Sequence, residues 1–281
     1  MKNRRLIITL FLCLLLLLWI LWGSFTLEVN TYTITSPRIP EEFSGFRIAQ
    51  ISDLHNAEFG EGNVLLLEKL SAAHPDAIFL TGDLIDSRST DVPLALSFVE
   101  AAADIAPVYF VTGNHEARVA QYNDLKTGLK KLGVTILDNQ KVILQKGNSH
   151  ITILGIDDPS FLTGYLFGDS TSVTSAALAQ LTSDSDGYTI LLSHRPELFD
   201  TYAHYNLDLV FSGHAHGGQF RLPLIGGLFA PNQGFFPEYD GGLYTSGTTH
   251  MLVSRGIGNS IIPLRIHNPP EILVAELHPQ S

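Results

Sequence analysis

Five short apolar runs recur between residues 46 and 213, and each has the composition of a buried β-strand. These runs cover residues 46–52, 77–82, 108–113, 189–193 and 209–213. Segments with helical patterns lie between or after them, at residues 63–73, 93–103, 121–132 and 174–181. Because alternating strands and helices form βαβ units, the pattern predicts an α/β fold with a largely parallel sheet flanked by helices.

An uncharged, mostly apolar run extends from Leu6 to Leu27, after the basic residues Lys2, Arg4 and Arg5. Roughly 20 apolar residues span the hydrocarbon core of a bilayer as a helix. We therefore predict a cytoplasmic tail and one transmembrane helix in residues 1–27, followed by one catalytic domain in residues 28–281. A cleaved signal peptide is the alternative, although no A-x-A cleavage site follows the run. The basic residues before the run, with none directly after it, predict that the catalytic domain lies outside the cytoplasmic membrane.

The charge of the chain argues against nucleic acid as a partner. Lys and Arg number 17 against 28 Asp and Glu, a net charge of −11. Without the three basic residues of the first 27, the remainder has 14 against 28, or −14. Such an acidic surface repels a phosphate backbone. The one cysteine, Cys13, lies in the apolar run, so residues 28–281 contain neither disulfides nor thiolate ligands.

Each of the five predicted strands is closely followed by side chains that can bind a metal ion. These side chains belong to Asp53, His55, Asp83, Asn114, His115, His194, His214 and His216. In open α/β sheets, ligands gather beyond the carboxyl ends of the strands. An isolated histidine or aspartate after a strand is commonly a turn former, but the recurrence at five strand ends predicts a metal centre there.

The spacing of the candidates supports this interpretation. Asp53 and His55 are two residues apart, as are His214 and His216, and an extended backbone points such a pair to one side. Glycine directly precedes a candidate at three strand ends, where the chain must turn sharply or approach the site closely. These glycines are Gly82, Gly113 and Gly213.

Oxygen and nitrogen ligands without sulfur suit two divalent ions such as Mn, Fe or Zn, of which we favour Mn. Two such ions share a bridging carboxylate, activate water near neutral pH and bind a phosphate oxygen. The residues therefore predict a two-metal centre that can activate water and bind a phosphate group.

These motifs resemble those of the calcineurin-like metallophosphoesterases, and they occur in that family's order. The matching segments are Asp53-Leu54-His55, Gly82-Asp83, Gly113-Asn114-His115-Glu116, His194 and Gly213-His214-Ala215-His216. Residues 217–223 and 254–260 look like the bacterial membrane-associated branch, which includes UDP-2,3-diacylglucosamine hydrolases and exported phosphodiesterases. The resemblance implies two packed β-sheets flanked by helices, with a dimetal site at one sheet edge.

The resemblance also implies a role for each motif residue. The residues that would bind the first metal are Asp53, His55 and His216, with Asp83 as the bridging ligand. The residues that would bind the second metal are Asn114, His194 and His214. His115 would not bind metal but would protonate the leaving oxygen, which is ordinary chemistry for a histidine near neutral pH.

Other polar residues near the motifs have less specific interpretations. Asp86 lies where some family members carry an acid that pairs with the catalytic histidine, and a solvated turn residue is the alternative. Arg195, Arg221 and Arg255 are candidate phosphate contacts because guanidinium matches phosphate geometry, although exposed surface arginines are common. We expect Glu116 to be structural.

We therefore predict a dimetal hydrolase of phosphodiester or pyrophosphate bonds. A phosphomonoesterase, and a metal-binding scaffold without turnover, are the alternatives.

A further prediction is a lipid-bearing substrate, because residues 217–244 follow the last motif and are rich in Gly, Pro, Leu and Phe. The residues that would line an apolar groove beside the metals, or else form ordinary core, are Leu222, Leu224, Ile225, Leu228, Phe229, Phe235 and Phe236.

Overall fold

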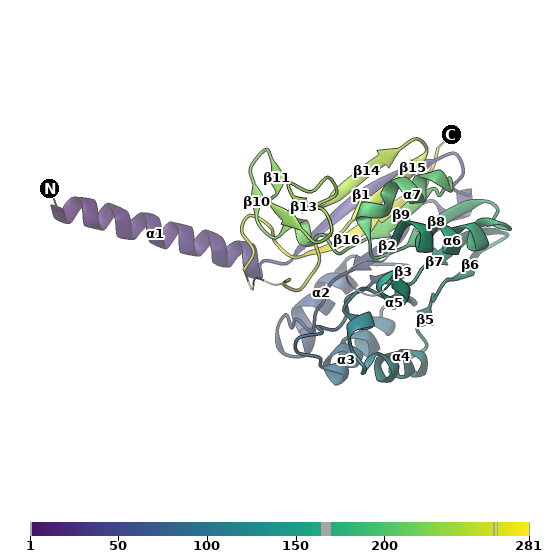
Figure 1. Ribbon diagram of the computed structural model, residues 1–281, viewed down its shortest axis with the longest axis horizontal. Coiled ribbons are helices and arrows are strands. Elements are labelled where there is room, and N and C mark those ends of the chain that lie inside the picture. Colours follow the sequence, from purple (N-terminus) through teal and green to yellow (C-terminus); the bar gives the residue numbers. More distant parts are fainter. Residues whose placement is uncertain (1, 164–169, 261, 263, 281) are drawn as a thin grey trace.

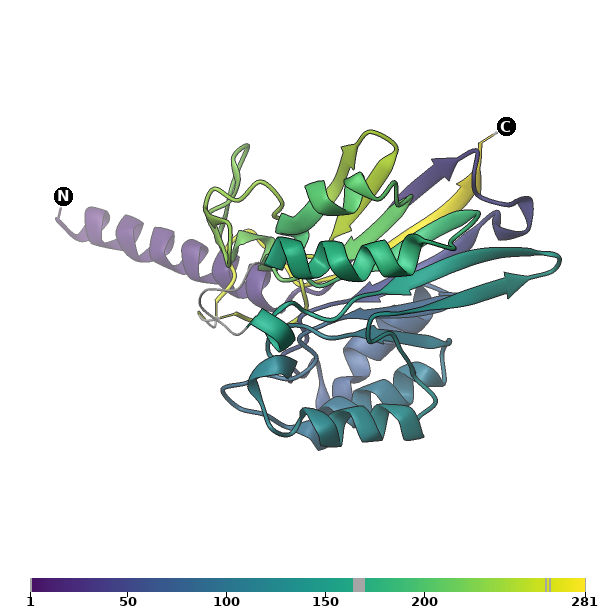
Figure 2. The same ribbon diagram turned by 45° about the vertical axis from the view of Figure 1, so that its right-hand side comes forward.

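The protein folds into two six-stranded β-sheets packed face to face, with helices on both outer faces (Figure 1). The structure, a computed structural model, describes residues 2–163, 170–260, 262 and 264–280. Figure 2 shows the same layers after a turn, with α2, α3 and α4 on one side of the sandwich and α6 and α7 on the other.

The first sheet has the strand order β1-β16-β2-β3-β4-β5. The strands are β1 Glu28–Ser36, β16 Glu271–Pro279, β2 Phe46–Ile51, β3 Ala77–Thr81, β4 Val108–Val111 and β5 Thr135–Ile136. Its pairings are parallel except that between β16 and β2. The sheet thus joins the start of the globular part to the C-terminal strand.

The second sheet has the order β14-β15-β9-β8-β7-β6. Its strands are β14 Gly242–Ser246, β15 Thr249–Val253, β9 Leu209–Ser212, β8 Tyr188–Leu192, β7 Ser149–Gly155 and β6 Gln140–Lys146. The three central pairings are parallel and the two outer ones antiparallel.

Helices cover the outer faces, and two small hairpins follow β9. The helices are α1 Lys2–Phe25, α2 Val64–Ala72, α3 Val92–Ala103, α4 Tyr122–Lys131, α5 Ser160–Thr163, α6 Ser170–Thr182 and α7 Phe199–His204. The hairpin strands are β10 Arg221–Leu222, β11 Gly226–Gly227, β12 Phe229–Ala230 and β13 Gly234–Phe235. Asp91 is the N-cap of α3: its carboxylate accepts a hydrogen bond from the backbone N–H of Leu94, which explains why the helix begins at Val92.

Apolar side chains fill three layers. Between the sheets, Phe79 packs edge-on against Tyr109 of the first sheet and Phe211 of the second. Outside the first sheet, Phe98 of α3 is buried, and outside the second sheet Leu178 of α6 is buried. Strands β3, β4, β8 and β9 are buried along their whole length, which explains their nearly continuous apolar sequences.

The predicted α/β class is confirmed, and the five predicted strands form within a residue or two of their expected bounds. The expectation of one largely parallel sheet is wrong, because the strands divide between two mixed sheets. Three ligand-bearing strands lie in the first sheet and two in the second. The two-sheet arrangement implied by the family resemblance is the one observed.

Helix α1 projects from the sandwich in both views (Figure 1, Figure 2). Its last turns contact residues 265–267: the Ser24 hydroxyl donates to the Arg265 carbonyl, and the Trp19 ring lies 5.8 Å from the His267 ring. The predicted membrane span within residues 1–27 is not confirmed. No helix in the described part of the chain combines the length and the apolar character needed to cross a bilayer.

Candidate metal centre

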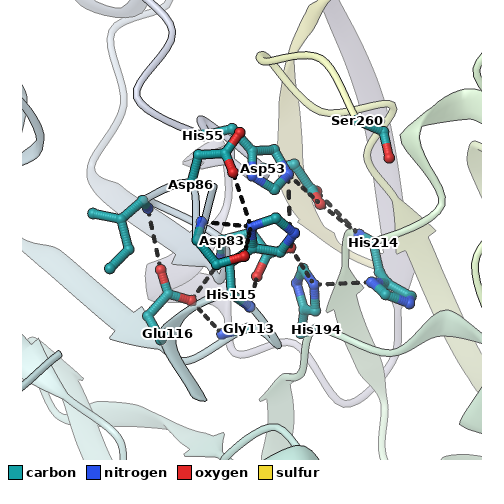
Figure 3. Close-up of polar contacts among 12 residues, drawn as sticks. Asp53, His55, Asp83, Asp86, Gly113, His115, Glu116, His194, His214 and Ser260 are labelled. Carbon is teal, nitrogen blue, oxygen red and sulfur yellow. Dashed lines mark hydrogen bonds and ion pairs between the residues drawn. The ribbon is translucent and has the colours of Figure 1, made fainter. Parts of the chain in front are cut away.

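The loops after β2, β3, β4, β8 and β9 meet at one end of the sandwich and carry the candidate ligands. In Figure 3 the side chains of Asp53, His55, Asp83, His194 and His214 point toward one another. All seven candidate ligands are buried. Two groups of three place their ligand atoms within 4.8 Å of one another: the first ligand cluster is Asp53, His55 and His216, and the second is Asp83, His194 and His214.

The first ligand cluster joins the two sheets. His55 Nε2 lies 3.1 Å from His216 Nε2, and His216 Nε2 lies 3.3 Å from Asp53 Oδ1. Asp53 is fixed by the Ser52 hydroxyl, which donates to its Oδ2 at 2.6 Å, and by the backbone N–H of His214. Three ligand atoms therefore converge on one point.

The second ligand cluster lies beside the first. His194 Nε2 lies 3.2 Å from Asp83 Oδ2 and 3.1 Å from His214 Nδ1. The same Asp83 Oδ2 lies 3.6 Å from His55 Nε2, so this oxygen stands between the clusters. This is the position that the family resemblance implies for a bridging ligand.

Asn114 is the remaining candidate ligand. It lies between Gly113 and His115, and the His115 backbone N–H donates to Asp83 Oδ1 at 2.7 Å. The Asn114 Oδ1 atom is buried without a hydrogen-bond partner among the described residues. Because buried polar atoms are normally paired, an orphaned amide oxygen directly before the residue whose N–H contacts Asp83 fits a metal ligand. The donors suit Mn, Fe or Zn.

Burial keeps most of the histidines in the neutral form that binds metal. Burial lowers the pKa of His55 to about 3. Burial, together with Arg195, lowers the pKa of His214 well below its ordinary value, and burial with His55 does the same for His216. For His194 burial opposes protonation, but the Asp83 carboxylate prevails and raises the pKa to about 10. The protonation of His194 is therefore governed by its ion pair with Asp83.

Five of the seven candidates have a left-handed backbone. Their φ angles are 53° at Asp53, 49° at His55, 52° at Asp83, 64° at His214 and 48° at His216. Such conformations cost of order 1 kcal/mol or more for a residue other than glycine and cluster at functional sites. The prediction that extended backbone aligns the two i, i+2 pairs is therefore wrong, because tight turns bring them together.

The glycines before the candidates are required by close approach. A Cβ atom at Gly82 would collide with the backbone of Gly113 and with the His194 ring. A Cβ at Gly113 would collide with Asp83, and one at Gly213 with Ser52 and Asp53. A side chain at any of the three would push ligand-bearing loops apart.

Glu116 holds two of these loops together. Its Oε2 accepts the backbone N–H groups of Asp83 and Gly113, both at 2.8 Å, and its Oε1 accepts that of Ile85 at 3.2 Å. Glu116 is fully buried. Its geometry agrees with the expected structural role.

Replacing Glu116 with alanine is expected to lower the free energy of unfolding by about 3 kcal/mol or more, because three buried N–H groups lose their acceptor. Chemical denaturation measures the loss. Glu116→Gln, which keeps one acceptor oxygen, should lose less, and Glu100→Ala on the exposed side of α3 is the control. An unchanged denaturation midpoint for Glu116→Ala would contradict this role.

His115 lies at the accessible side of the site. Its ring packs edge-on against His55, with centroids 4.4 Å apart, and its Nε2 lies 4.0 Å from Asp83 Oδ2. Its Nδ1 accepts the backbone N–H of Ser87 at 3.0 Å, whereas Asp86 Oδ1 is 3.5 Å away and faces the Arg88 guanidinium. Asp86 is thus near His115, but Ser87 makes the closer contact.

The three candidate arginines have different surroundings. Arg195 is buried beside the second ligand cluster and donates to both carboxylate oxygens of Asp158. Arg221 pairs with Asp240, and Arg255 pairs with Glu28 and Glu271. The latter two line a separate cavity of about 260 Å³, whose lining includes none of the candidate ligands. Of the three candidate arginines, Arg195 is the one that contacts a candidate ligand, with its Nη1 atom 3.1 Å from His214 Nε2.

Two asparagines support the ligands and were not identified from the sequence. Asn232 Oδ1 lies 3.1 Å from His214 Nε2. The Asn268 side chain donates to the backbone carbonyls of His216 and Gln219, at 2.7 and 3.1 Å. The segment Pro231-Asn232-Gln233-Gly234 signals a turn, but nothing in it indicates a contact with a histidine 18 residues earlier.

Comparison with known proteins agrees with this geometry. The sequence profile of the calcineurin-like phosphoesterases matches residues 46–218. The chain is 33% identical over 264 residues to the uncharacterized metallophosphoesterase YkuE of Bacillus subtilis, covering 89% of this chain and 85% of YkuE. It is 30% identical over 241 residues to the phosphodiesterase YaeI of Escherichia coli, covering 83% and 82%.

A solved structure shows the same fold. TT1561 of Thermus thermophilus superposes with a TM-score of 0.52 at 12% identity, over 76% of this chain and 90% of that one. The matched profile covers more than half of the chain and contains all seven candidate ligands. This chain therefore belongs to the calcineurin-like phosphoesterase family.

Proposed function

We propose that this protein hydrolyses phosphodiesters with two divalent ions held by Asp53, His55, Asp83, Asn114, His194, His214 and His216. That it is a metal-dependent phosphoesterase follows from its family and its two ligand clusters. The observation that carries the assignment is Asp83 Oδ2, which lies 3.6 Å from His55 Nε2 and 3.2 Å from His194 Nε2. One carboxylate oxygen between two clusters is the arrangement that a pair of ions requires.

The chain's own residues supply the rest of the chemistry. When bound, a pair of divalent ions activates water as a nucleophile and neutralises charge on the phosphate. His115 is the accessible imidazole nearest the clusters and is placed to give its proton to the leaving oxygen. The Ser87 N–H donates to Nδ1 of the neutral ring, which leaves the proton on Nε2, facing Asp83. When the ring is doubly protonated and acts as an acid, Asp86 Oδ1, 3.5 Å from Nδ1, is the acceptor for the second proton.

Similarity to YaeI, a phosphodiesterase, favours diesters over monoesters. The test is a turnover comparison of the full chain, loaded with Mn, Zn or Fe, on chromogenic diesters and on the matched monoesters. Faster turnover of the diester supports the proposal. Preference for the monoester would make the protein a phosphomonoesterase, and no turnover of either by a protein that binds two ions would favour the scaffold alternative.

An apolar cavity beside the first ligand cluster supports the narrower proposal of a substrate with an apolar chain. The cavity has a volume of about 280 Å³. Its wall includes Ala215 and His216 on the metal side, and the remaining wall is mainly Phe220, Leu228, Phe229, Pro231, Phe235 and Ile262. Because His216 belongs to both, the cavity adjoins the first ligand cluster, and we infer that it holds the apolar chain of a substrate whose phosphate binds at the clusters.

The lining side chains are also exposed to an unusual degree. Phe235 is 71% exposed and Phe229 44%, and Leu224 and Ile225 of the neighbouring hairpin are fully or largely exposed. Contiguous exposed apolar surface generally marks a binding site. This exposure is unlike that of an ordinary core, which is the alternative interpretation of this segment.

Specificity for phosphodiesters that differ only in acyl chain length is expected to rise with length, because each buried methylene contributes about 0.8 kcal/mol, or nearly fourfold. The measurement is kcat/KM below micelle-forming concentrations. Phe229→Ser should flatten this rise and leave a small chromogenic diester unaffected. Leu243→Ser, at a similarly exposed position on β14, is the control. A flat chain-length dependence in the unaltered enzyme would refute the apolar-substrate proposal and leave the dimetal assignment intact.

A further inference from the structure

The turn of the hairpin formed by β12 and β13 reaches into the metal centre. Asn232 lies in this turn with a left-handed backbone, φ 63°, and is exposed to solvent. Its Oδ1 nevertheless lies 3.1 Å from His214 Nε2. The hairpin that lines the apolar cavity with Phe229 and Phe235 thus also contacts a candidate ligand.

The orientation of the Asn232 amide is fixed by a second contact. The Arg195 guanidinium, at Nη1, donates to Asn232 Oδ1 at 2.9 Å. A guanidinium has no acceptor, so the oxygen of the amide, and not its NH₂ group, faces Arg195 and His214. Arg195 is held in turn by Asp158, through both carboxylate oxygens, and by the Ser160 hydroxyl at 3.0 Å.

The two polar neighbours of His214 Nε2 differ in what they offer. Arg195 Nη1, at 3.1 Å, has only hydrogens to donate, whereas Asn232 Oδ1 accepts. His214 Nδ1 faces His194 and the second ligand cluster. A neutral imidazole that binds an ion through Nδ1 carries its proton on Nε2, and this proton needs an acceptor. Asn232 Oδ1 is the acceptor in place.

We propose that Asn232 is a positioning residue that accepts the Nε2 proton of His214 and so holds the Nδ1 lone pair toward the second metal. Arg195 orients the Asn232 amide by donating to its oxygen, and Asp158 holds the Arg195 guanidinium in place. The inference rests on the proposed dimetal function. It also explains why an exposed turn residue is directed inward instead of into solvent.

The test compares metal affinities of the full chain. Asn232→Gly removes the amide and keeps the left-handed backbone free of strain, so it should fold normally. We expect it to bind one of the two Mn²⁺ ions about 10–100-fold more weakly, as for other outer-shell partners of metal ligands. Asn232→Asp, whose carboxylate accepts the same proton, should restore the affinity. Titration with Mn²⁺ and elemental analysis after gel filtration provide the readout.

Asn206→Gly is the matched control, because Asn206 is also exposed, with φ 52°, in the turn after α7. It should bind both ions as the unaltered protein does. Unchanged affinity for both ions in Asn232→Gly, or failure of Asn232→Asp to restore a lost affinity, would overturn the positioning role. If the unaltered protein itself binds fewer than two ions, the proposed dimetal function fails instead.

Discussion

Asp83→Ala is expected to lose both metal ions and to reduce turnover by on the order of 10³-fold or more. The physical reason is that one carboxylate oxygen lies within 3.6 Å of a histidine in each ligand cluster. Bound metals contribute several kcal/mol of charge stabilisation in the transition state, and each 1.36 kcal/mol is a factor of ten in rate. Elemental analysis of the purified variant and diester turnover are the measurements.

Two further variants make the result specific to the charge of Asp83. Asp83→Asn keeps the shape of the side chain and the oxygen that accepts the His115 backbone N–H, so this variant should fold. Because it lacks the negative charge, it should nevertheless bind metal poorly. Asp104→Ala, an exposed change after α3, should bind two ions and turn over normally. Two ions retained per chain in Asp83→Ala would exclude Asp83 from the bridging position.

His115→Ala is expected to keep both ions and to lose about 10²–10⁴-fold in kcat, the usual contribution of a general acid. Its backbone N–H still reaches Asp83 in this variant, because that contact does not involve the side chain. A leaving group that is already a weak base needs no proton, so kcat for a diester with such a leaving group should fall least in His115→Ala. The measurement is the rate loss across a series of diesters graded by leaving-group pKa.

His204→Ala, at an exposed position in α7, is the control for that series. Equal losses for good and poor leaving groups would contradict the general-acid role. Loss of metal in His115→Ala would instead make His115 a metal ligand. A ligand atom of His115 lies within 4.8 Å of ligand atoms of His55 and Asp86, so this outcome is geometrically feasible.

The sequence predicted the part of the fold that carries the chemistry. Strands β3, β4, β8 and β9 are buried along their whole length, and β2 is buried except at Arg47. A strand of that kind is a nearly continuous apolar run that composition alone identifies. Their ligands follow directly in sequence. Strands such as β1, with alternating exposure, and β6, which is mostly exposed, carry a weaker signal and were missed.

The division into two sheets could not be obtained from strand patterns. It depends on pairing between distant segments, such as β1 with β16 and β15 with β9, and on which faces bury one another. The family resemblance supplied this arrangement, whereas the alternation of strands and helices suggested a single sheet.

Some features of the site could likewise not be predicted from the sequence. Spacing showed that Asp53 and His55 belong together, but not that both adopt left-handed conformations. The side chains of Asn232 and Asn268 form hydrogen bonds with His214 and His216, and no sequence motif connects either asparagine with these histidines. Such contacts are set by how hairpins and loops dock, which residue type and spacing do not encode.

The origin of the ligands has a mechanical consequence. The first ligand cluster combines Asp53 and His55 from the first sheet with His216 from the second, and the second ligand cluster combines Asp83 with His194 and His214. Each bound ion would therefore act as a cross-link between the sheets at one end of the sandwich. Because an ion that binds the folded state stabilises it by mass action, chelation would remove these cross-links and lower the free energy of unfolding.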